Sequence, residues 1–486
     1  MFCPDPGGDA PLGAGETRKE ASSGSMTTFP DAHYLILSSR LIPGLDGGYT
    51  IATLARAAHM AAAGVRTVRL LTFDPGTATD HAAHRAEFAR RGQLGNPDAL
   101  TGNGVEASAA LMNLFDEAGE DRSWLLAAAA PGERDASLQY REIPDAAGRP
   151  LAALPNVPDP SGWHLSTAPV VVYQADGREA GIVAGFGGLY RAWLEHIVAR
   201  LRESADLPVV VICESRQLGE LLTDWSDPGI RIIHTIHTMH VEPPFTPDAP
   251  LNSLWERWFA LAHRFDAVAW PTAAQRDDVA QRFGGDNHLV VPNGVQIPDE
   301  PALERAGGLV VMMNRLAPGK RVDHTIRAFL AADVTGTSLD IYGDGPERAR
   351  LQQLIDDLGA GERVTLRGPT TDPGAALDAA ELFVTSTEYE GQGLAVVEAL
   401  AHGCPVVAYD IRYGPADALA AGGGVLVPPG DERALADAIR SVMGDEQLRV
   451  SLAREAPDAA RRWSADAAMD ALAEAVRHVV AAPPRR

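Results

Sequence analysis

Segments typical of buried strands alternate with segments typical of amphipathic helices along most of this chain, and they do so in two successive sets. The first set opens with an apolar run at residues 34–39, a Gly-rich loop at 40–48, a helical pattern at 49–65 and a second strand pattern at 67–73. The second set begins after residues 299–307 with the strand-like run GLVVMMNRL. Alternating strands and helices form parallel sheets with helices on both faces. The sequence therefore predicts an α/β chain with two doubly wound, Rossmann-like domains facing a cleft, where a ligand would lie at the carboxyl ends of the strands.

The same patterns predict the domain boundaries. Residues 1–32 form a tail rich in Pro, Gly and Ser that we expect to be disordered, and Met26 is an alternative start to Met1. We expect an N-terminal domain at residues 33–298, a C-terminal domain at 299–465, and a helix that packs back across both domains at 466–486.

One stretch of the N-terminal domain interrupts the alternation. It spans residues 76–186 approximately, and it begins as a polar, weakly patterned segment. It continues as hairpins with turns at Ala147-Gly148 and Asp176-Gly177, where glycine permits the backbone to reverse. We interpret this stretch as a β-rich insertion in the first domain.

Charge and cysteine content argue against several classes of protein. The formal net charge of −23 opposes nonspecific attraction to nucleic acid or to an anionic membrane. There is no apolar run long enough to cross a bilayer, and the tail has no continuous apolar segment, so we expect no secretory signal. Apart from Cys3 in the tail, only Cys213 and Cys404 occur, a usage typical of reduced thiols and of neither disulfides nor a metal site. We expect a cytoplasmic protein with no nucleic-acid partner and no transmembrane segment.

Two cations follow the first strand of the second set. In the loop NRLAPGK, Arg315 precedes Lys320 by five residues. Guanidinium and ammonium donors at the carboxyl end of a parallel strand suit a diphosphate, because they can share its oxygens. A solvated surface pair would show the same pattern.

Two carboxylates, Glu390 and Glu398, flank a Gly-Gln-Gly turn in the segment EYEGQGLAVVEAL. If a helix begins near Gly393, the free N–H groups there and at Leu394 would face an anion, and the glycines would let it approach the backbone. Glu398 would lie among apolar neighbours, where an unpaired carboxylate needs a partner. A nucleotide-sugar would satisfy both acids, with Glu398 on the ribose diol and Glu390 on the transferred sugar. Glu390 could also be an ordinary acid at a helix start.

At these residues the chain resembles the retaining glycosyltransferases of the GT-B fold, family 4. Their two glutamates separated by seven residues match Glu390 and Glu398, and their Arg-Leu-x-x-x-Lys phosphate motif matches Arg315–Lys320. The segments at residues 291–295 and 341–347 also fall where that family has them. The resemblance implies transfer of a hexose or N-acetylhexosamine from a UDP-sugar to a hydroxyl, with retention of configuration.

The resemblance also implies which residues form the donor site. Gly47 and Gly48, in the loop after the first strand, would bring backbone N–H groups against the donor from the other domain, although a tight turn alone would also need them. Gln392 departs from the family, since many members carry an aromatic residue there. The donor-binding residues expected are Gly47, Gly48, Arg315, Lys320, Gln392, Gly393, Leu394 and Glu398.

Three further segments, CESRQLGELL, IHTMH and YDIRYGPADAL, narrow the resemblance. They are similar to the subgroup of wall teichoic acid α-glycosyltransferases and of the enzyme that adds the first GlcNAc to serine-rich adhesins. The subgroup's His-x-x-His pattern fits His237 and His240, and it implies that His237 contacts the transferred sugar and is catalytic together with Glu390. The acceptor implied is a polyol-phosphate polymer, protein Ser/Thr or another glycan. In that subgroup the insertion carries oligomerisation or acceptor contacts, so a homo-oligomer is expected.

The sequence also bears on metal binding and on two other functions. His234, His237 and His240 recur at three-residue spacing, but their segment is β-branched and does not place them on one helix face. The chain also has no Asp-X-Asp, so we expect no metal and no cofactor, with the UDP-sugar as substrate. A noncatalytic GT-B-like subunit that binds a glycosylated protein is the alternative function. A nicotinamide-dependent oxidoreductase is disfavoured, because no G-x-G-x-x-G follows a strand.

Overall fold

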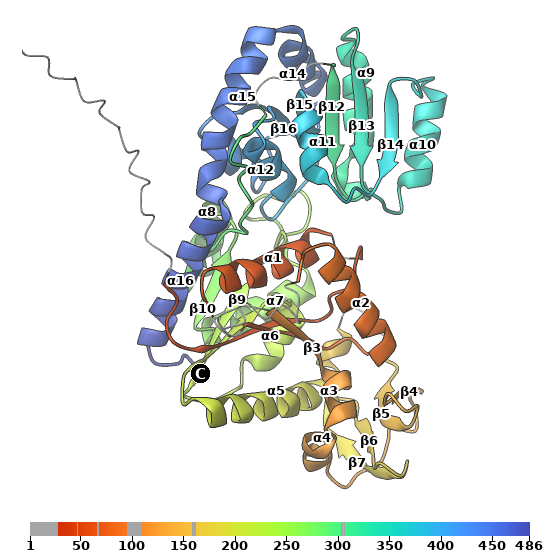
Figure 1. Cartoon of the computed structure of the whole chain (residues 1–486), viewed down its shortest axis with the longest axis vertical. Helices are drawn as coiled ribbons and strands as arrows, with labels where there is room; N and C mark the ends of the chain where they lie inside the picture. Colours follow the sequence, from red (N-terminus) through yellow and green to blue (C-terminus); the bar gives the residue numbers. More distant parts are fainter. Residues whose placement is uncertain are drawn as a thin grey trace, which may run out of the picture.

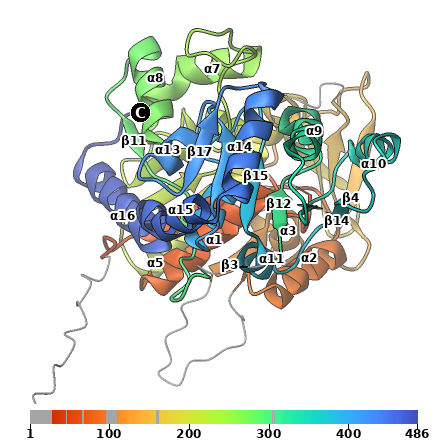
Figure 2. The ribbon, with the colours of Figure 1, turned by 90° about the horizontal axis from the view of Figure 1, so that it is seen from above.

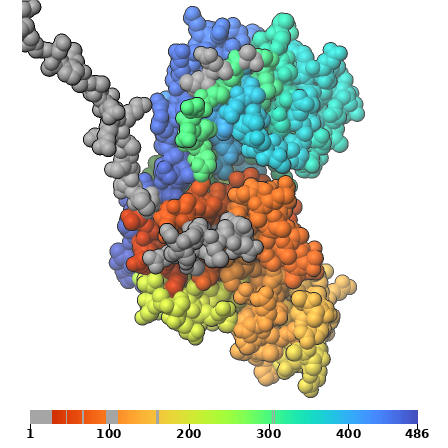
Figure 3. Space-filling model, in the orientation of Figure 1, coloured from red at the N-terminus to blue at the C-terminus, as the bar shows by residue number. Residues whose placement is uncertain are grey.

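The computed structural model describes residues 28–45, 47–65, 68–94, 109–157, 162–302, 305 and 307–486. These residues fold into two α/β domains, one above the other in Figure 1. In the space-filling view the C-terminal domain rests on the N-terminal domain (Figure 3). Residues 1–27, with most of the predicted tail and both candidate start methionines, lie outside the described part of the chain.

The N-terminal domain is built on a seven-stranded sheet, in which every pair of neighbouring strands is parallel. Its strands run in the order β11 (His288–Val290), β10 (Ala267–Trp270), β9 (Ile230–Thr235), β8 (Val209–Cys213), β1 (His33–Ser38), β2 (Val68–Thr72) and β3 (Ala109–Asn113). Its helices are α1 (Gly48–Ala62), α2 (Ala78–Arg90), α3 (Leu114–Glu120), α4 (Ser123–Ala128), α5 (Gly185–Ser204), α6 (Arg216–Leu222), α7 (Ser253–Leu261) and α8 (Ala273–Phe283).

Both faces of this sheet are covered by helices, as a doubly wound domain requires. Along β1, Leu35 and Leu37 join a core that includes residues of α5. Tyr34 and Ile36 point to the other face and join residues of α1 and of the C-terminal helix α16 (Ala465–Ala481). A strand buried on both faces is apolar throughout, which is why the run at residues 34–39 could be predicted.

The C-terminal domain has a six-stranded parallel sheet. Its strands run in the order β14 (Val364–Gly368), β13 (Ser338–Tyr342), β12 (Leu309–Met313), β15 (Leu382–Thr385), β16 (Val406–Tyr409) and β17 (Gly424–Val427). Its helices are α9 (Val322–Ala332), α10 (Arg348–Asp357), α11 (Pro373–Ala379), α12 (Leu394–Ala401), α13 (Pro415–Leu419), α14 (Glu432–Gly444) and α15 (Glu446–Ala460). Seen from above, α9 and α14 lie side by side over the sheet (Figure 2).

The β-rich insertion is confirmed as an antiparallel sheet of four strands, β4 (Tyr140–Pro144), β5 (Pro150–Pro155), β6 (Val170–Tyr173) and β7 (Glu179–Val183). It lies at the far end of the N-terminal domain from the C-terminal domain (Figure 1). Both predicted turns are present, and Gly148 and Gly177 adopt φ values of 77° and 84°. The sequence pattern did not indicate β3, which pairs with β2 in the main sheet. As a short edge strand with half-buried Leu111 and Met112, it lacks a long apolar run.

Two chain segments cross between the domains, and they are bonded to each other. The Val295 N–H donates to Trp463 O at 2.9 Å, and the Ala465 N–H donates to Val295 O at 2.8 Å. Gly294 packs so closely that a Cβ there would lie 2.8 Å from Ala465 Cα. After this crossing α16 returns to the N-terminal domain, where Leu472 and Val476 are fully buried.

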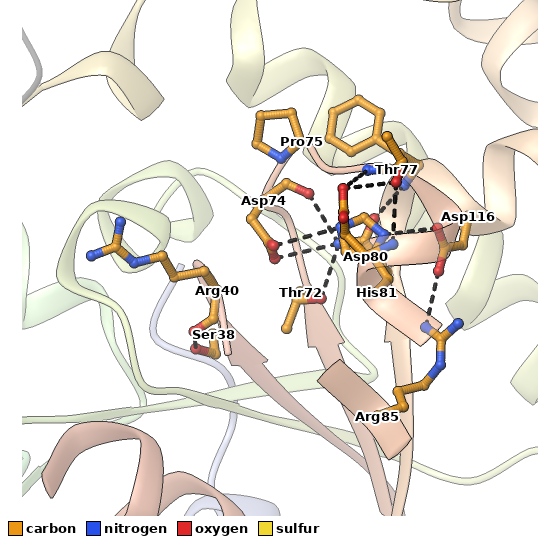
Figure 4. Close-up of polar contacts among 12 residues, drawn as sticks. Ser38, Arg40, Thr72, Asp74, Pro75, Thr77, Asp80, His81, Arg85 and Asp116 are labelled. Atoms are coloured by element: carbon orange, nitrogen blue, oxygen red, sulfur yellow. Dashed lines mark hydrogen bonds and ion pairs between the residues drawn. The ribbon is translucent and has the colours of Figure 1, made fainter. Parts of the chain in front are cut away.

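A polar cluster fixes the carboxyl ends of β2 and β3. His81 of α2 lies between two carboxylates, with Nδ1 at 2.8 Å from Asp116 Oδ1 and Nε2 at 3.6 Å from Asp74 Oδ2 (Figure 4). Arg85 donates to the other oxygen of Asp116 at 2.9 Å. Burial opposes the charge on His81, but the two carboxylates outweigh it and raise its pKa to about 9. The charged imidazole therefore ties α2 to the strand ends at neutral pH.

We predict that this cluster makes stability depend on alkaline pH. A histidine whose pKa is raised from 6.5 to about 9 contributes its full stabilisation below its ordinary pKa and loses it as the pH rises through 9. The free energy of unfolding of the wild type relative to His81→Gln should therefore fall by on the order of 2 to 3 kcal/mol between pH 6.5 and pH 10. Urea unfolding at several pH values measures this. The exposed His263→Gln is the control, and a difference that does not change with pH would contradict the prediction.

Candidate functional site

The carboxyl ends of the two parallel sheets bring most of the predicted residues toward one another. His237 follows β9 in the N-terminal domain, and Glu390 follows β15 in the C-terminal domain. The two loops touch, because a Cβ at Gly391 would lie 2.5 Å from the carbonyl oxygen of His237. Only glycine allows the backbone of the Gly-Gln-Gly turn to come this close.

The cations of the NRLAPGK loop differ in their surroundings. Lys320 Nζ donates to Glu390 Oε1 at 2.6 Å, and both side chains keep part of their exposure, 24% and 20%. Arg315 is exposed, and its guanidinium makes no hydrogen bond or ion pair with the described residues. A partly exposed ion pair contributes little to stability. An anion can therefore replace Glu390 as the partner of Lys320 at a small cost in free energy, and it can also pair with the guanidinium of Arg315.

The helix α12 starts one residue after Gly393, close to the predicted position. Gly393 is the N-cap, with φ 76°, and no side chain caps the first N–H groups of the helix. Glycine is suited to this left-handed conformation. The predicted start of the helix is therefore confirmed, and the donor contact expected of Gly393 and Leu394 stays a prediction.

Glu398 is a carboxylate without a partner among the described residues. It lies on α12, where Val397, Ala399 and Leu400 are fully buried, and it keeps partial exposure itself. Burial raises the pKa of Glu398, and the nearby His402 offsets this only in part. A desolvated and unpaired carboxylate is expensive in a folded protein. The structure thus leaves Glu398 in need of a hydrogen-bond donor from outside the described chain.

The side chain of Gln392 is engaged with the N-terminal half of the chain. Its Nε2 donates to Asn293 O at 2.9 Å, and its Oε1 accepts from the Asn293 N–H at 2.8 Å. Only 4% of Gln392 is exposed. Its carboxamide therefore links the Gly-Gln-Gly turn to the segment at residues 291–295, and the donor contact expected of Gln392 stays a prediction.

The N-terminal domain presents the Gly-Gly turn and His237. Gly47 caps α1 with φ 49°, and a Cβ built on Gly47 or Gly48 would meet no atom within 4 Å. A ligand could thus approach this backbone. The ring of His237 packs edge-on against Tyr49, with ring centroids 5.1 Å apart, and its Nε2 lies 2.5 Å from Glu214 Oε2.

Glu214 and Arg56 are parts of this site that the sequence reading missed. Glu214 follows β8 directly, its side chain has no exposure, and Arg56 Nε donates to it at 2.8 Å. Arg56 lies on α1, 158 residues earlier in the chain, so no local motif connects the two. The available signal was a single carboxylate placed directly after an apolar strand.

The other two histidines of the IHTMH region are core residues. His234 and His240 are fully buried, and burial lowers the pKa of each to about 4. His240 stacks on Tyr413 with centroids 6.1 Å apart. Across the residues that the structure describes, no three His, Cys, Asp or Glu side chains are grouped to hold a metal ion.

Two family models match the chain, one in each domain. The model described as "Glycosyltransferase Family 4" matches residues 187–297, which include Glu214 and His237. The model described as "Glycosyl transferases group 1" matches residues 297–459, which include Arg315, Lys320, Glu390 and Glu398. Glu214, His237 and the C-terminal residues of the candidate site therefore lie in segments that match glycosyltransferase models, whereas Gly47 and Gly48 lie outside both matched ranges.

Curated relatives match only part of the chain. It is 34% identical over 158 residues to the poly(ribitol-phosphate) alpha-N-acetylglucosaminyltransferase of Staphylococcus aureus. The matched segment covers 32% of this chain and 32% of that protein. It is 41% identical over 180 residues to an exopolysaccharide phosphotransferase of Streptomyces coelicolor, which covers 36% of this chain and 19% of that protein. The chain thus spans less than half the length of these relatives.

The fold matches over nearly the whole chain. A variant of S. aureus TarM, crystallised with UDP, fondaparinux and α-GlcNAc-glycerol, superimposes with a TM-score of 0.68 at 17% identity, covering 92% of this chain and 99% of that one. The predicted GT-B fold is confirmed, and the chain resembles the predicted subgroup.

We predict that Glu398→Gln stabilises the free protein at neutral pH, because it removes an unpaired carboxylate. A carboxyl whose folded-state pKa is raised costs nothing below its ordinary pKa of 4.5, and it destabilises the fold progressively as the pH rises from 4.5 to the raised value and fully above it. The variant should therefore melt about 2 to 4 °C higher than the wild type at pH 7.5, the shift that about 1 kcal/mol gives in a domain of this size. The two proteins should melt alike near pH 4. A lower Tm for the variant at pH 7.5 would show that Glu398 is already satisfied within the protein.

Proposed function

We propose that this chain, which joins a family 4 segment and a group 1 segment in one GT-B fold, is a retaining, metal-independent glycosyltransferase. It would move a hexose or N-acetylhexosamine from a UDP-sugar to a hydroxyl group. The observation that carries the proposal is a set of groups without adequate partners on one side of the domain boundary. Arg315 and Glu398 have none among the described residues, and Lys320 has only a partly exposed Glu390. A nucleotide-sugar supplies the diphosphate and the hydroxyls that these groups lack.

The lysine content of the chain supports this role for Lys320. The chain has 42 lysines and arginines, and Lys19 and Lys320 are its only lysines. Arginine thus serves nearly every cationic position, but position 320 keeps the compact ammonium group. An ammonium can contact phosphate oxygens as a point charge without the planar fork of arginine. Lys320 and Arg315 would neutralise the charge that develops on the leaving diphosphate, as a metal ion does elsewhere.

The proposed chemistry needs no enzymatic nucleophile. The acceptor hydroxyl attacks the anomeric carbon on the face from which the diphosphate departs. The bond from that carbon to the diphosphate oxygen breaks, and a leaving phosphate oxygen takes the acceptor's proton. Glu390 and His237 would contact the sugar during this step, and Glu398 would hold the ribose diol. UDP is released with this proton on its terminal phosphate, and the proton then exchanges with water.

For the acceptor, we favour a hydroxyl on a polyol-phosphate polymer, with protein Ser/Thr or another glycan as alternatives. The support is the partial match to the poly(ribitol-phosphate) enzyme of S. aureus. The insertion sheet, which holds none of the proposed donor residues, would supply acceptor or oligomer contacts. We place the protein in the cytoplasm, which fits the free, buried state of Cys213 and Cys404, the two cysteines within the described residues. None of the helices in the described ranges has the length and apolar character of a membrane span.

We predict that UDP binds in the presence of EDTA and that labelled UDP-GlcNAc or UDP-glucose is hydrolysed or transferred there. Lys320→Ala should weaken the binding of UDP by about 1.5 to 3 kcal/mol, the contribution of a charge-assisted hydrogen bond. Isothermal titration calorimetry measures the affinity. Since Lys320 is the only lysine outside the tail, UDP should also protect it from reductive methylation, as read by mass spectrometry.

Three outcomes of this experiment decide between functions. Binding abolished by EDTA would contradict metal independence. Unchanged affinity in Lys320→Ala would contradict the phosphate site. Tight UDP binding with no sugar released or transferred to cell-wall, lipid or protein fractions would support the noncatalytic subunit instead.

We predict that His237→Ala lowers kcat by on the order of 100-fold or more, because the imidazole would contact the sugar as it reacts. UDP affinity should stay nearly unchanged, since the proposed contact of the ring is with the sugar and not with the nucleotide. His234→Ala is the comparison, and it should lower the Tm and leave kcat within about threefold, because His234 is a core residue. Normal turnover in a folded His237→Ala protein would show that His237 has only a structural role.

A further inference from the structure

The ring of His237 is held by a carboxylate behind it. Its Nε2 lies 2.5 Å from Glu214 Oε2, and its Nδ1 has no partner among the described residues. The ring is partly exposed, at 11%. Tyr49 packs edge-on against it. One nitrogen is therefore used by the protein, and the other is left for a ligand.

Glu214 can only accept hydrogen bonds at neutral pH. Although burial opposes its charge, Arg56, His237 and Thr235 outweigh burial and lower its pKa to about 2. Arg56 Nε donates to Oε1, and the Thr235 hydroxyl donates to Oε2. An ionised carboxylate has no proton to donate, so Nε2 of His237 must carry the hydrogen in this contact. In the neutral form of the ring with its hydrogen on Nε2, Nδ1 is an acceptor.

A chain of buried hydrogen bonds continues from Glu214 to the other domain. Arg56 Nη2 donates to Asn293 Oδ1 at 2.9 Å, and both side chains are buried. The backbone of Asn293 is bonded in both directions to the carboxamide of Gln392, at 2.8 and 2.9 Å. Gln392 directly precedes Gly393, the N-cap of α12. The carboxylate behind His237 is thus connected, residue by residue, to the start of the helix that carries Glu398.

We infer that Glu214 is the positioning residue for His237, fixing its tautomer and orientation, and that Arg56, Asn293 and Gln392 hold Glu214 in register with the Gly-Gln-Gly turn before α12. This inference deepens the proposed glycosyl transfer and rests on it. Glu214 is shielded from any ligand, so it acts through the imidazole. With Nε2–H bonded to Glu214, Nδ1 can accept a hydrogen bond from a hydroxyl of the transferred sugar. The charge of Glu214 would also favour positive charge developing at the anomeric carbon.

A purely structural buried pair is the competing explanation. Buried arginine–carboxylate pairs also occur outside functional sites, and breaking such a pair destabilises a protein whatever its function. Asp266 and Arg486 form such a pair. The Oδ2 atom of Asp266 lies 2.5 Å from Arg486 Nη1, and both side chains are buried. The same oxygen accepts from the Ile232 N–H at 2.6 Å. Asp266 lies just before β10, away from the carboxyl ends of the strands. Asp266→Asn is therefore the matched control for loss of a buried charge.

The test compares Glu214→Gln, His237→Ala and the double variant. Glutamine keeps the shape of Glu214 but can donate to the ring, which moves the imidazole hydrogen to Nδ1. We expect kcat for sugar release or transfer to fall about 10- to 100-fold, the usual effect of losing such an orienting partner. The Kd for UDP should change less than about threefold, because Glu214 touches no ligand. In the His237→Ala background, Glu214→Gln should lower kcat no further, since two residues that act as one unit are not additive.

A spectroscopic measurement is independent of activity. Nitrogen-15 NMR of labelled histidine should show His237 protonated at Nε2 in the wild type and at Nδ1 in Glu214→Gln. Asp266→Asn should lower the Tm with an unchanged His237 signal and unchanged kcat. If the double variant shows the product of the two single losses, or if the tautomer is the same in Glu214→Gln, the inference is wrong.

These outcomes separate the inference from the proposed function. A wild-type protein that shows the expected tautomer but releases no sugar from any nucleotide-sugar would overturn glycosyl transfer, and with it the catalytic use of this contact. An active wild type with additive variants would overturn only the positioning role. If Glu214→Gln does not fold, Arg56→Lys and Asn293→Ala provide the same comparison one and two bonds further from the ring. Each should then lower kcat and leave UDP affinity within about threefold.

Discussion

A charge without access to water must be matched by donors, and the arrangement of this site depends on one such charge, that of Glu214. Its donors come from α1, from the end of β9 and from the loop beyond it. The contact with Arg56 links α1 to the end of β8. Because α1 begins at Gly48, the same contact places the open Gly-Gly turn and Tyr49 relative to His237. One buried carboxylate thus aligns the parts of the N-terminal domain that face the second domain.

The two sides of the domain boundary differ in how far their polar groups are paired within the protein. On the N-terminal side the polar groups around His237 are satisfied by one another, which makes the imidazole rigid before any ligand arrives. On the C-terminal side Arg315, Lys320 and Glu398 are left open or weakly paired. A rigid arrangement of side chains can orient a reacting group. Groups that lack partners in the free protein can gain favourable contacts when a ligand binds. Under the proposed function, the C-terminal side would supply most of the donor binding and the N-terminal side would orient His237, and the Gln392–Asn293 contact is one place where the two sides meet.

The sequence predicted the features that local pattern encodes. Apolar runs at strand positions, the glycines of the turns, the cations of the NRLAPGK loop and the paired glutamates could all be recognised within short windows. It did not reveal what depends on distant contacts. Arg56 and Glu214 are 158 residues apart, and Gln392 and Asn293 are 99 apart, so their pairing follows only from the assembled fold. The strand β3 was missed for another reason, since an edge strand needs little apolar sequence to pair. The roles assigned to the site residues stay predictions.

The return of α16 to the first domain has a consequence for biosynthesis. Residues of α16, including Leu472 and Val476, complete the core that Tyr34 and Ile36 begin. During translation the first sheet therefore emerges from the ribosome long before the helix that covers part of one of its faces. The apolar face that α16 covers in the finished protein therefore stays exposed, or is covered by a chaperone, while the whole second domain is synthesised. The N-terminal domain should consequently reach its final stability only after the C-terminal domain has been synthesised, so the two acquire their native state in the reverse of their order along the chain.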